Sequence, residues 1–222
     1  MPHRSYLFAP GNHPRKVEKV FSCGADAVIL DLEDAVAIKE KRATRSLVVD
    51  ALKSKRSSRG YVRVNGFDTD FCFDDINQVV GPWLDGIVLP MVELPGQLET
   101  VHWLLCNLEA NAAMEPGRID LIPIIETGKG INNLNEIASA NVNGRLRRIA
   151  FGAGDYTNDM NMQWSIGEDE LREARASIVL QSRAHDLEPP IDTVWINIKD
   201  LENLEKSSLN AKNSGFQGKM CI

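Results

Sequence analysis

The sequence predicts an α/β protein built as a parallel (β/α)8 barrel. Short apolar segments alternate with amphipathic segments along the 222 residues, so that eight strands are expected and no strand or helix is doubled. This alternation is typical of parallel strands joined by crossover helices. The apolar segments are short, largely continuous and bounded by turn residues, which indicates strands buried on both faces. Eight strands in a chain of this length fit a closed barrel.

Each expected strand is an apolar run that ends at polar or turn residues, as Tyr6-Leu7-Phe8-Ala9 does before Pro10-Gly11-Asn12. The fifth run, Leu121-Ile122-Pro123-Ile124-Ile125, is followed at once by Glu126. In order, the expected strands are residues 6–9, 27–32, 61–65, 86–90, 121–125, 148–152, 191–195 and 218–222.

Between the strands lie segments whose apolar residues recur on one helical face, such as Leu98, Val101 and Leu105 in the longest of them. The first such segment stops at Gly24, and Glu168 and Asp169 are favourable in the first turn of a later one. In order, the expected helices are residues 14–21, 39–53, 74–80, 95–113, 132–139, 168–185 and 201–213. Residues 157–159 are expected in a loop.

The alternative fold is an open doubly wound sheet. Its dinucleotide-binding version is disfavoured because no G-x-G-x-x-G pattern follows the first strand. No linker or low-complexity segment divides the chain, so we expect one barrel domain over residues 1–222. A barrel of this kind normally ends with a helix after the eighth strand, and none follows residues 218–222 here.

Composition narrows the classes of function. The net charge of −6 and the lack of a Lys/Arg tract argue against a nucleic-acid-binding surface. Four scattered cysteines without a C-x-x-C pair, and no signal peptide, indicate a cytoplasmic protein with reduced thiols. No apolar run is long enough to span a membrane. The four histidines form no zinc-ligand spacing.

Five charged residues follow or end the expected strands: Glu33 and Asp34 after the second, Arg63 in the third, Glu126 after the fifth and Asp155 after the sixth. The carboxyl ends of barrel strands meet on one face, which is where such folds carry their chemistry. Glu126 and Asp155 come from neighbouring strands and make a hard-oxygen site of the kind that suits Mg²⁺. The alternative is that both carboxylates only cap strands or pair with Arg63.

Arg63 lies between Val62 and Val64, so alternation can turn its side chain into the barrel. A guanidinium there needs an anion, and its fork matches a carboxylate. We expect it to bind a substrate carboxylate; the alternative is a buried ion pair with Asp31 or Glu33. Gly154 belongs to a glycine-rich strand end that lets the backbone approach a ligand closely.

These segments resemble the citrate lyase β-subunit-like branch of the HpcH/HpaI aldolase and citrate lyase family. The matching pieces, in family order, are Arg4-Ser5-Tyr6-Leu7-Phe8-Ala9-Pro10-Gly11, Gly24-Ala25-Asp26-Ala27-Val28-Ile29-Leu30-Asp31-Leu32-Glu33-Asp34-Ala35-Val36, Val62-Arg63-Val64-Asn65, Ile124-Ile125-Glu126-Thr127, Phe151-Gly152-Ala153-Gly154-Asp155 and Gly215-Phe216-Gln217-Gly218-Lys219-Met220-Cys221-Ile222. They cover nearly the whole chain.

The resemblance implies a TIM barrel that cleaves a carbon–carbon bond in a β-hydroxyacyl thioester, such as citramalyl-, malyl- or citryl-CoA, to give an acyl-CoA and an oxo-acid. It implies Mg²⁺ as the cofactor, held by Glu126 and Asp155, with Glu33 and Asp34 supporting it through water. Arg63 is implied as the group that binds the oxo-acid carboxylate, with Glu126, Gly154 and Asp155 also lining the substrate site. The implied assembly is a homo-oligomer, with a trimer favoured.

The chain departs from the family pattern at two places. Relatives commonly continue past the eighth strand with His-Pro and a helical lid segment, whereas this sequence ends at Ile222, so we expect a barrel truncated after that strand. Met91 stands where many relatives have Lys, which removes a charge from the end of the fourth strand.

Two other functions stay open from the sequence. One is a class II-type aldolase that releases pyruvate from a substrate without a thioester. The other is a non-catalytic ligand-binding or complex subunit, which the missing lid favours and the presence of Arg63, Glu126 and Asp155 together disfavours.

Overall fold

The computed structural model describes residues 3–222, in which eight parallel strands form a closed barrel. The strands follow one another around the barrel in chain order, and β1 pairs with β8 to close it. The predicted barrel is therefore confirmed, and the open-sheet alternative is wrong. The strands are β1 (Ser5–Pro10), β2 (Ala27–Asp31), β3 (Arg59–Arg63), β4 (Gly86–Leu89), β5 (Asp120–Ile125), β6 (Ala150–Phe151), β7 (Ile191–Asp192) and β8 (Gly218–Cys221).

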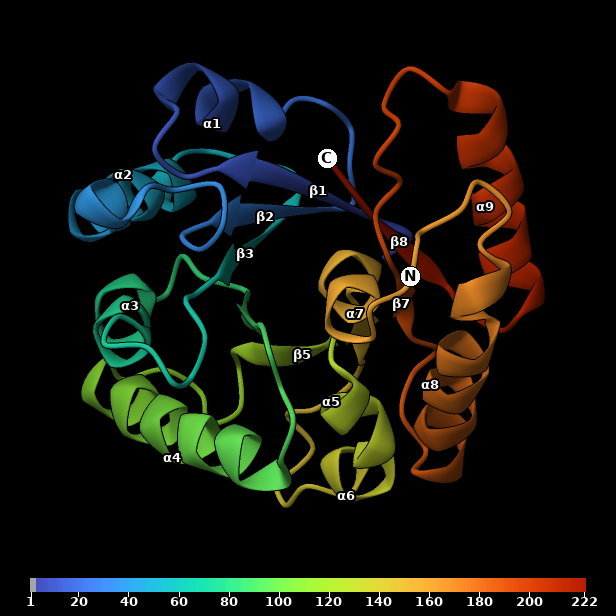
Figure 1. Ribbon diagram of the computed structural model, residues 1–222. Helices are drawn as coiled ribbons and strands as arrows, with labels where there is room; N and C mark the ends of the chain where they lie inside the picture. Colours follow the sequence, from blue (N-terminus) through green and yellow to red (C-terminus); the bar gives the residue numbers. More distant parts are fainter. Residues whose placement is uncertain (1–2) are drawn as a thin grey trace.

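Helices surround the strands, and Figure 1 shows α2, α3, α4, α6, α8 and α9 around the outside of the barrel. The α-helices are α1 (Pro14–Val20), α2 (Lys41–Lys53), α3 (Cys72–Val79), α4 (Pro95–Asn111), α5 (Gly128–Asn132), α6 (Leu134–Ala138), α7 (Ala153–Asp159), α8 (Arg172–Ala184) and α9 (Leu201–Asn213). Short 3₁₀ turns, Ile38–Glu40 and Asp169–Leu171, precede α2 and α8. Within residues 3–222, no helix has the length and apolarity needed to cross a bilayer.

Three details of the predicted elements are wrong. The sixth and seventh strands are shorter than expected, since β6 and β7 pair only through Ala150 and Ile191. Residues 157–159, expected in a loop, belong to helix α7. The helix predicted at residues 132–139 is shorter, as α6, and a separate short helix, α5, precedes it.

The buried apolar side chains form two layers, as period-two alternation along each strand requires. An inner cluster fills the barrel, and a larger outer cluster lies between the strands and the helices. In β2, for example, Ile29 belongs to the inner cluster while Val28 and Leu30 belong to the outer one. The inner cluster consists of Tyr6, Ala27, Ile29, Tyr61, Val88, Ile122, Ile124, Ala150, Ile191 and Met220.

A buried ion pair fixes the entry to β5. Arg145 is 0% exposed and donates to both carboxylate oxygens of Glu109 on α4, at 2.8 and 2.7 Å. It also donates to the Ile119 carbonyl at 2.6 Å, directly before β5 begins. Because β5 carries Glu126 at its other end, this pair helps to anchor the strand on which the candidate site depends.

We expect Arg145→Ala to lower the free energy of unfolding by about 3–5 kcal/mol, because it leaves the Glu109 carboxylate buried without its partner. Urea denaturation measures this change. The matched control is Arg147→Ala, two residues along the chain, whose side chain is 58% exposed and lies 3.5 Å from Asp120. Its effect should stay within about 0.5 kcal/mol, and equal losses in the two variants would contradict the assignment.

Candidate active site

Three charged side chains extend the inner layer of the barrel at its C-terminal mouth. Asp31, Arg63 and Glu126 each lie two residues after a residue of the inner apolar cluster, on β2, on β3 and after β5. The preceding inner residues are Ile29, Tyr61 and Ile124. Since alternate residues of a strand share a face, the same pattern that fills the core brings these charges to one place.

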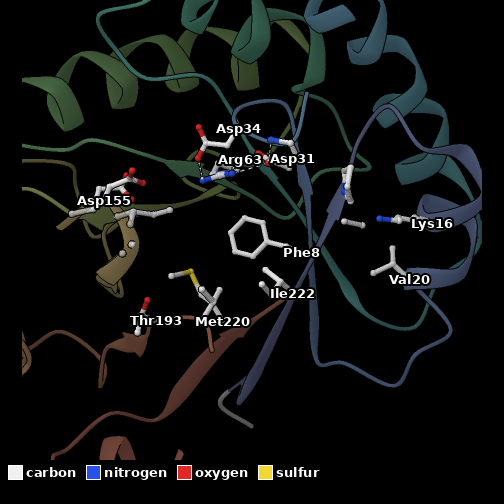
Figure 2. Close-up of a pocket in the computed structure, with 18 of the residues that line it drawn as sticks. Phe8, Lys16, Val20, Asp31, Asp34, Arg63, Asp155, Thr193, Met220 and Ile222 are labelled. Carbon is white, nitrogen blue, oxygen red and sulfur yellow. Dashed lines mark hydrogen bonds and ion pairs between the residues drawn. The ribbon is translucent and has the colours of Figure 1, made fainter. Parts of the chain in front are cut away.

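A cavity of about 810 Å³ opens at this mouth. Of the residues predicted from the sequence, Asp34, Arg63, Glu126, Gly154 and Asp155 line it. Figure 2 shows Phe8 near the middle of the view, with Asp155 on one side and Lys16 and Val20 on the other. Glu33 is not among the lining residues, but it contacts Arg63 at the cavity wall.

Arg63 is bound in a two-pronged ion pair with Asp31. Its Nε and Nη2 donate to the two carboxylate oxygens of Asp31, both at 2.7 Å. The two residues are partners in the register of β2 and β3, so the pair crosses directly between neighbouring strands. Burial alone would lower the pKa of Arg63, but the hydrogen bonds and charge of Asp31 raise it overall. The guanidinium therefore remains charged and fixed in orientation.

The remaining terminal nitrogen of Arg63 faces two more carboxylates. Nη1 lies 2.8 Å from Glu33 Oε2 and 3.2 Å from Asp34 Oδ2. The ion-pair alternative raised for Arg63 is thus present in the structure, and its role as a substrate clamp stays a prediction. The pKa of Glu33 is raised to about 7, chiefly by burial and also by the charges of Asp34, Asp31 and Asp155, against the opposing effect of Arg63.

The loop after β2 is held by a buried lysine. Lys41 Nζ on α2 donates to the carbonyls of Leu32 and Glu33, at 3.0 and 2.7 Å, and to Asn65 Oδ1 at 2.6 Å. Asn65 in turn donates to Asp75 on α3 at 2.6 Å. These bonds satisfy polar groups that would be costly to bury alone, and they fix the backbone from which Glu33 and Asp34 project.

Glu126 is a buried carboxylate with no cationic side chain bound to it among the described residues. Its Oε1 accepts the backbone N–H of Met91 at 2.8 Å. Burial raises the pKa of Glu126 well above its ordinary value, Glu33 and Asp155 add to the rise, and the Met91 N–H and Arg63 oppose it. The site therefore favours either a proton or a cation at Glu126.

Met91 presents its N–H from an unusual backbone conformation, with φ of 54°. A side chain other than glycine rarely adopts this left-handed region, and such strain is often found at functional sites. The sequence showed only that Met91 replaces a lysine common in relatives. It carried no signal that the backbone of this residue holds Glu126.

Asp155 is exposed and lies in the first turn of α7, not on a strand end or in a loop. The residue before that helix, Gly152, packs directly against Glu126. A Cβ atom added at Gly152 would overlap the Glu126 carboxylate and lie 2.7 Å from Glu126 Cβ. A glycine is therefore needed at this position for the two carboxylates to share the mouth of the barrel.

The acidic side of the cavity fits a magnesium ion by its chemistry. Within residues 3–222, no group of three or more His, Cys, Asp or Glu side chains is arranged to hold a metal. Mg²⁺ takes only one or two protein carboxylates and keeps water or substrate oxygens at its other positions. Glu126 lacks a cationic partner, and its raised pKa is increased by Asp155 and Glu33, so the electrostatic field at this point favours a cation.

A second charged feature of the cavity was missed in the sequence. Arg15, Lys16 and Lys19 on α1 also line the cavity, and all three are exposed. Figure 2 shows Lys16 on the other side of Phe8 from Asp155. Among residues 3–222, none of them makes an ion pair. Their spacing over about one helical turn, directly after the first strand, was a signal that could have indicated a cationic rim.

Comparison with known proteins identifies the family. The profile of the HpcH/HpaI aldolase/citrate lyase family matches residues 4–222. The chain belongs to this family. It is 36% identical to the citrate lyase β subunit of Leuconostoc mesenteroides subsp. cremoris over 221 residues, which cover 99% of this chain and 72% of that relative.

Two further relatives extend the comparison. The L-malyl-CoA/β-methylmalyl-CoA lyase of Cereibacter sphaeroides (strain ATCC 17029 / ATH 2.4.9) is 30% identical over 247 residues, covering all of this chain and 75% of that relative. The structure of the M. tuberculosis citrate lyase β subunit complexed with oxaloacetate and magnesium is similar with a TM-score of 0.80 and 27% identity, over 99% of this chain and 91% of that one.

We expect Gly152→Ala to lower the free energy of unfolding by about 1–3 kcal/mol, because the added methyl group must displace the Glu126 side chain or the backbone. The matched control is Gly154→Ala on α7, where the nearest atom to the added Cβ, on Trp164, is 3.9 Å away. That variant should be unchanged or up to about 1 kcal/mol more stable. Urea unfolding of both variants checks this, and an unaffected Gly152→Ala would show that Glu126 is not packed as described.

Proposed function

We propose that the protein is a Mg²⁺-dependent carbon–carbon lyase that cleaves, or in reverse forms, a β-hydroxyacyl thioester carried on a phosphate-bearing arm such as that of coenzyme A. The observation that carries the proposal is one cavity with two differently charged ends. Glu126, Asp155 and Arg63 lie at one end and the α1 cations at the other. A small oxo-acid needs only the first end, whereas a phosphorylated thioester uses both.

In the proposed reaction, the bond between the thioester α-carbon and the hydroxyl-bearing carbon breaks. The hydroxyl loses its proton and becomes the carbonyl of the oxo-acid. The electron pair stays on the α-carbon as a thioester enolate, which then takes up a proton. Negative charge therefore develops first on the hydroxyl oxygen and then on the thioester, and the oxo-acid carboxylate is charged throughout.

The residues have distinct roles in this proposal. Glu126 and Asp155 hold the metal, which when bound stabilises the negative charge on the substrate oxygen. Arg63 binds and orients the oxo-acid carboxylate, because Asp31 fixes its guanidinium at the cavity wall. Glu33 and Asp34 contact Arg63 and are proposed to support the metal through water, and Gly154 leaves room for substrate along the wall.

The apolar middle of the cavity supports a thioester over a free hydroxy-oxo acid. Phe8, Val194 and Met220 line the wall between the charged ends, and the Phe8 ring lies 5.1 Å from the Arg63 guanidinium carbon. An apolar passage suits the uncharged part of a carrier arm, and uncompensated cations beyond it suit its phosphates. The magnesium and oxaloacetate bound by the M. tuberculosis relative agree with the chemistry proposed for the other end.

Magnesium binding should release protons and strengthen as pH rises. Burial is the main cause that raises the pKa of Glu126 well above normal and that of Glu33 to about 7, so protons compete with a cation for this carboxylate cluster. Below the raised pKa the proton competes with Mg²⁺, and above it the competition disappears. Calorimetry in buffers of different ionisation enthalpy measures both the affinity and the proton release.

The same titration tests the ligands. Glu126→Gln and Asp155→Asn should each weaken Mg²⁺ binding by at least about 100-fold, since even outer-shell partners of a metal cost about 10–100-fold. Glu93→Gln is the control, because Glu93 is paired with Lys129 at 2.8 Å and does not line the cavity. Unchanged affinity in both ligand variants, or no proton release by the wild type, would refute the metal site.

The proposed binding of the phosphate-bearing arm by the α1 cations is tested with two thioesters that share one acyl group and differ in their carrier. Lys16→Ala and Lys19→Ala should each raise KM for a hydroxyacyl-CoA about three- to fivefold, which corresponds to loss of one exposed charge pair. KM for the same acyl group on N-acetylcysteamine, which lacks phosphates, should not change. Glu18→Ala, on the same helix but not lining the cavity, is the matched control. Equal effects on the two thioesters would exclude a phosphate-binding role.

A further inference from the structure

One edge of the Arg63 guanidinium is left for a ligand, and two carboxylates of the chain already contact it. Nε and one N–H of Nη2 donate to Asp31. Nη1 and the second N–H of Nη2 form the remaining edge, and Nη1 lies 2.8 Å from Glu33 and donates to Asp34 at 3.2 Å. An oxo-acid carboxylate that binds this edge with both of its oxygens must therefore compete with carboxylates that are already in place.

Asp31 cannot be the group that gives way. It is 2% exposed, and its two oxygens also accept the backbone N–H groups of Glu33 and Ala35, at 3.0 and 3.1 Å. Removing its carboxylate from Arg63 would leave several buried polar groups unsatisfied. Asp31 thus belongs to the fixed wall of the site.

Glu33 and Asp34 have far fewer constraints. Among the described residues, the Glu33 carboxylate has only its ion pair with Arg63. The Asp34 carboxylate accepts a hydrogen bond from Nη1 at 3.2 Å, and its side chain is 68% exposed. Their backbone is anchored by Lys41, so a change would involve only side-chain rotation. Of the two, Glu33 is the shorter and more buried contact, and it is the stronger competitor for Nη1.

Glu33 also interacts electrostatically with the two carboxylates that are proposed to hold the metal. Asp155 raises the pKa of Glu33, and Glu33 raises that of Glu126, so these three carboxyl groups lie within electrostatic range of one another. A divalent cation held by Glu126 and Asp155 would reverse the sign of the field at Glu33. It would then favour rotation of the Glu33 carboxylate towards the cation and away from Arg63.

We propose that Glu33 is an internal competitor for Arg63 that divalent-cation binding displaces, so that the metal binds first and the oxo-acid second. This inference rests on the proposed function, and it adds an order of binding and a residue that enforces it. In the metal-free chain the Glu33 carboxylate occupies Nη1 of Arg63 and competes with any other carboxylate for it. With the metal bound, Nη1 becomes available to the substrate.

The inference predicts a specific coupling between two ligands. The coupling factor is the Kd for pyruvate in the presence of a chelator divided by its Kd in the presence of Mg²⁺. Part of this factor comes from direct contact between oxo-acid and metal, and the remainder comes from release of Glu33. Only the second part depends on Glu33.

Calorimetric titration with pyruvate, with and without Mg²⁺, separates the two parts. Glu33→Gln replaces a charged hydrogen-bond acceptor by a neutral one of the same size. It should tighten pyruvate binding in chelator about five- to tenfold, and lower the coupling factor by a similar ratio. Glu40→Gln makes the same chemical change outside the cavity, at a carboxylate that accepts a hydrogen bond from Asn12 at 2.8 Å, and is the matched control, with an expected change below about twofold.

The outcomes distinguish this inference from the proposed function. Arg63-dependent pyruvate binding with Mg²⁺, together with an unchanged coupling factor in Glu33→Gln, overturns the competitor role alone. Equal changes in Glu33→Gln and Glu40→Gln also overturn it, since they reflect general charge removal. If pyruvate does not bind the wild type with Mg²⁺, or binds Arg63→Ala equally well, both proposals fail. Thermal melting checks that each variant is folded. Glu33→Ala is the second variant at this position, and it should tighten pyruvate binding in chelator as Glu33→Gln does.

Discussion

The ion pair between Arg63 and Asp31 is the interaction on which the mouth of the barrel depends. It joins β2 to β3 with two hydrogen bonds of 2.7 Å, and Asp31 also accepts two backbone N–H groups from the loop that follows β2. Behind this loop, Lys41 and Asn65 tie it to α2 and to Asp75 on α3. A charged pair near the core is costly to desolvate, and this network provides the hydrogen bonds that offset the cost.

Much of this arrangement could be predicted from the sequence, because the apolar pattern of buried strands is visible in the sequence itself. Continuous apolar runs separated by amphipathic helices predict a parallel barrel, and a barrel brings its strand ends together. Arg63 and Glu126 therefore could be placed on one face without knowledge of any contact. The family resemblance was carried by the same strand ends, and the matched profile over residues 4–222 confirms it.

The remainder depended on side-chain and loop geometry that a one-dimensional pattern does not contain. Helix α7 was missed because Gly154, Asp155, Thr157 and Asn158 are weak helix formers, so its placement comes from packing on the barrel. The left-handed backbone of Met91 and the close contact of Gly152 with Glu126 are tertiary features. Which carboxylates share Arg63 depends on rotamers, and the sequence left that choice open.

The central claim is that one cavity joins a magnesium-dependent carboxylate site to a cationic rim for a thioester carrier. Its most direct test is to incubate the purified chain with a panel of hydroxyacyl-CoA thioesters and the matching free hydroxy acids, with Mg²⁺ or with chelator, and to identify products by mass spectrometry. The account predicts an acyl-CoA and an oxo-acid in equal amounts from at least one thioester, only with Mg²⁺. Cleavage that is indifferent to Mg²⁺, or that occurs only with free acids, would contradict it.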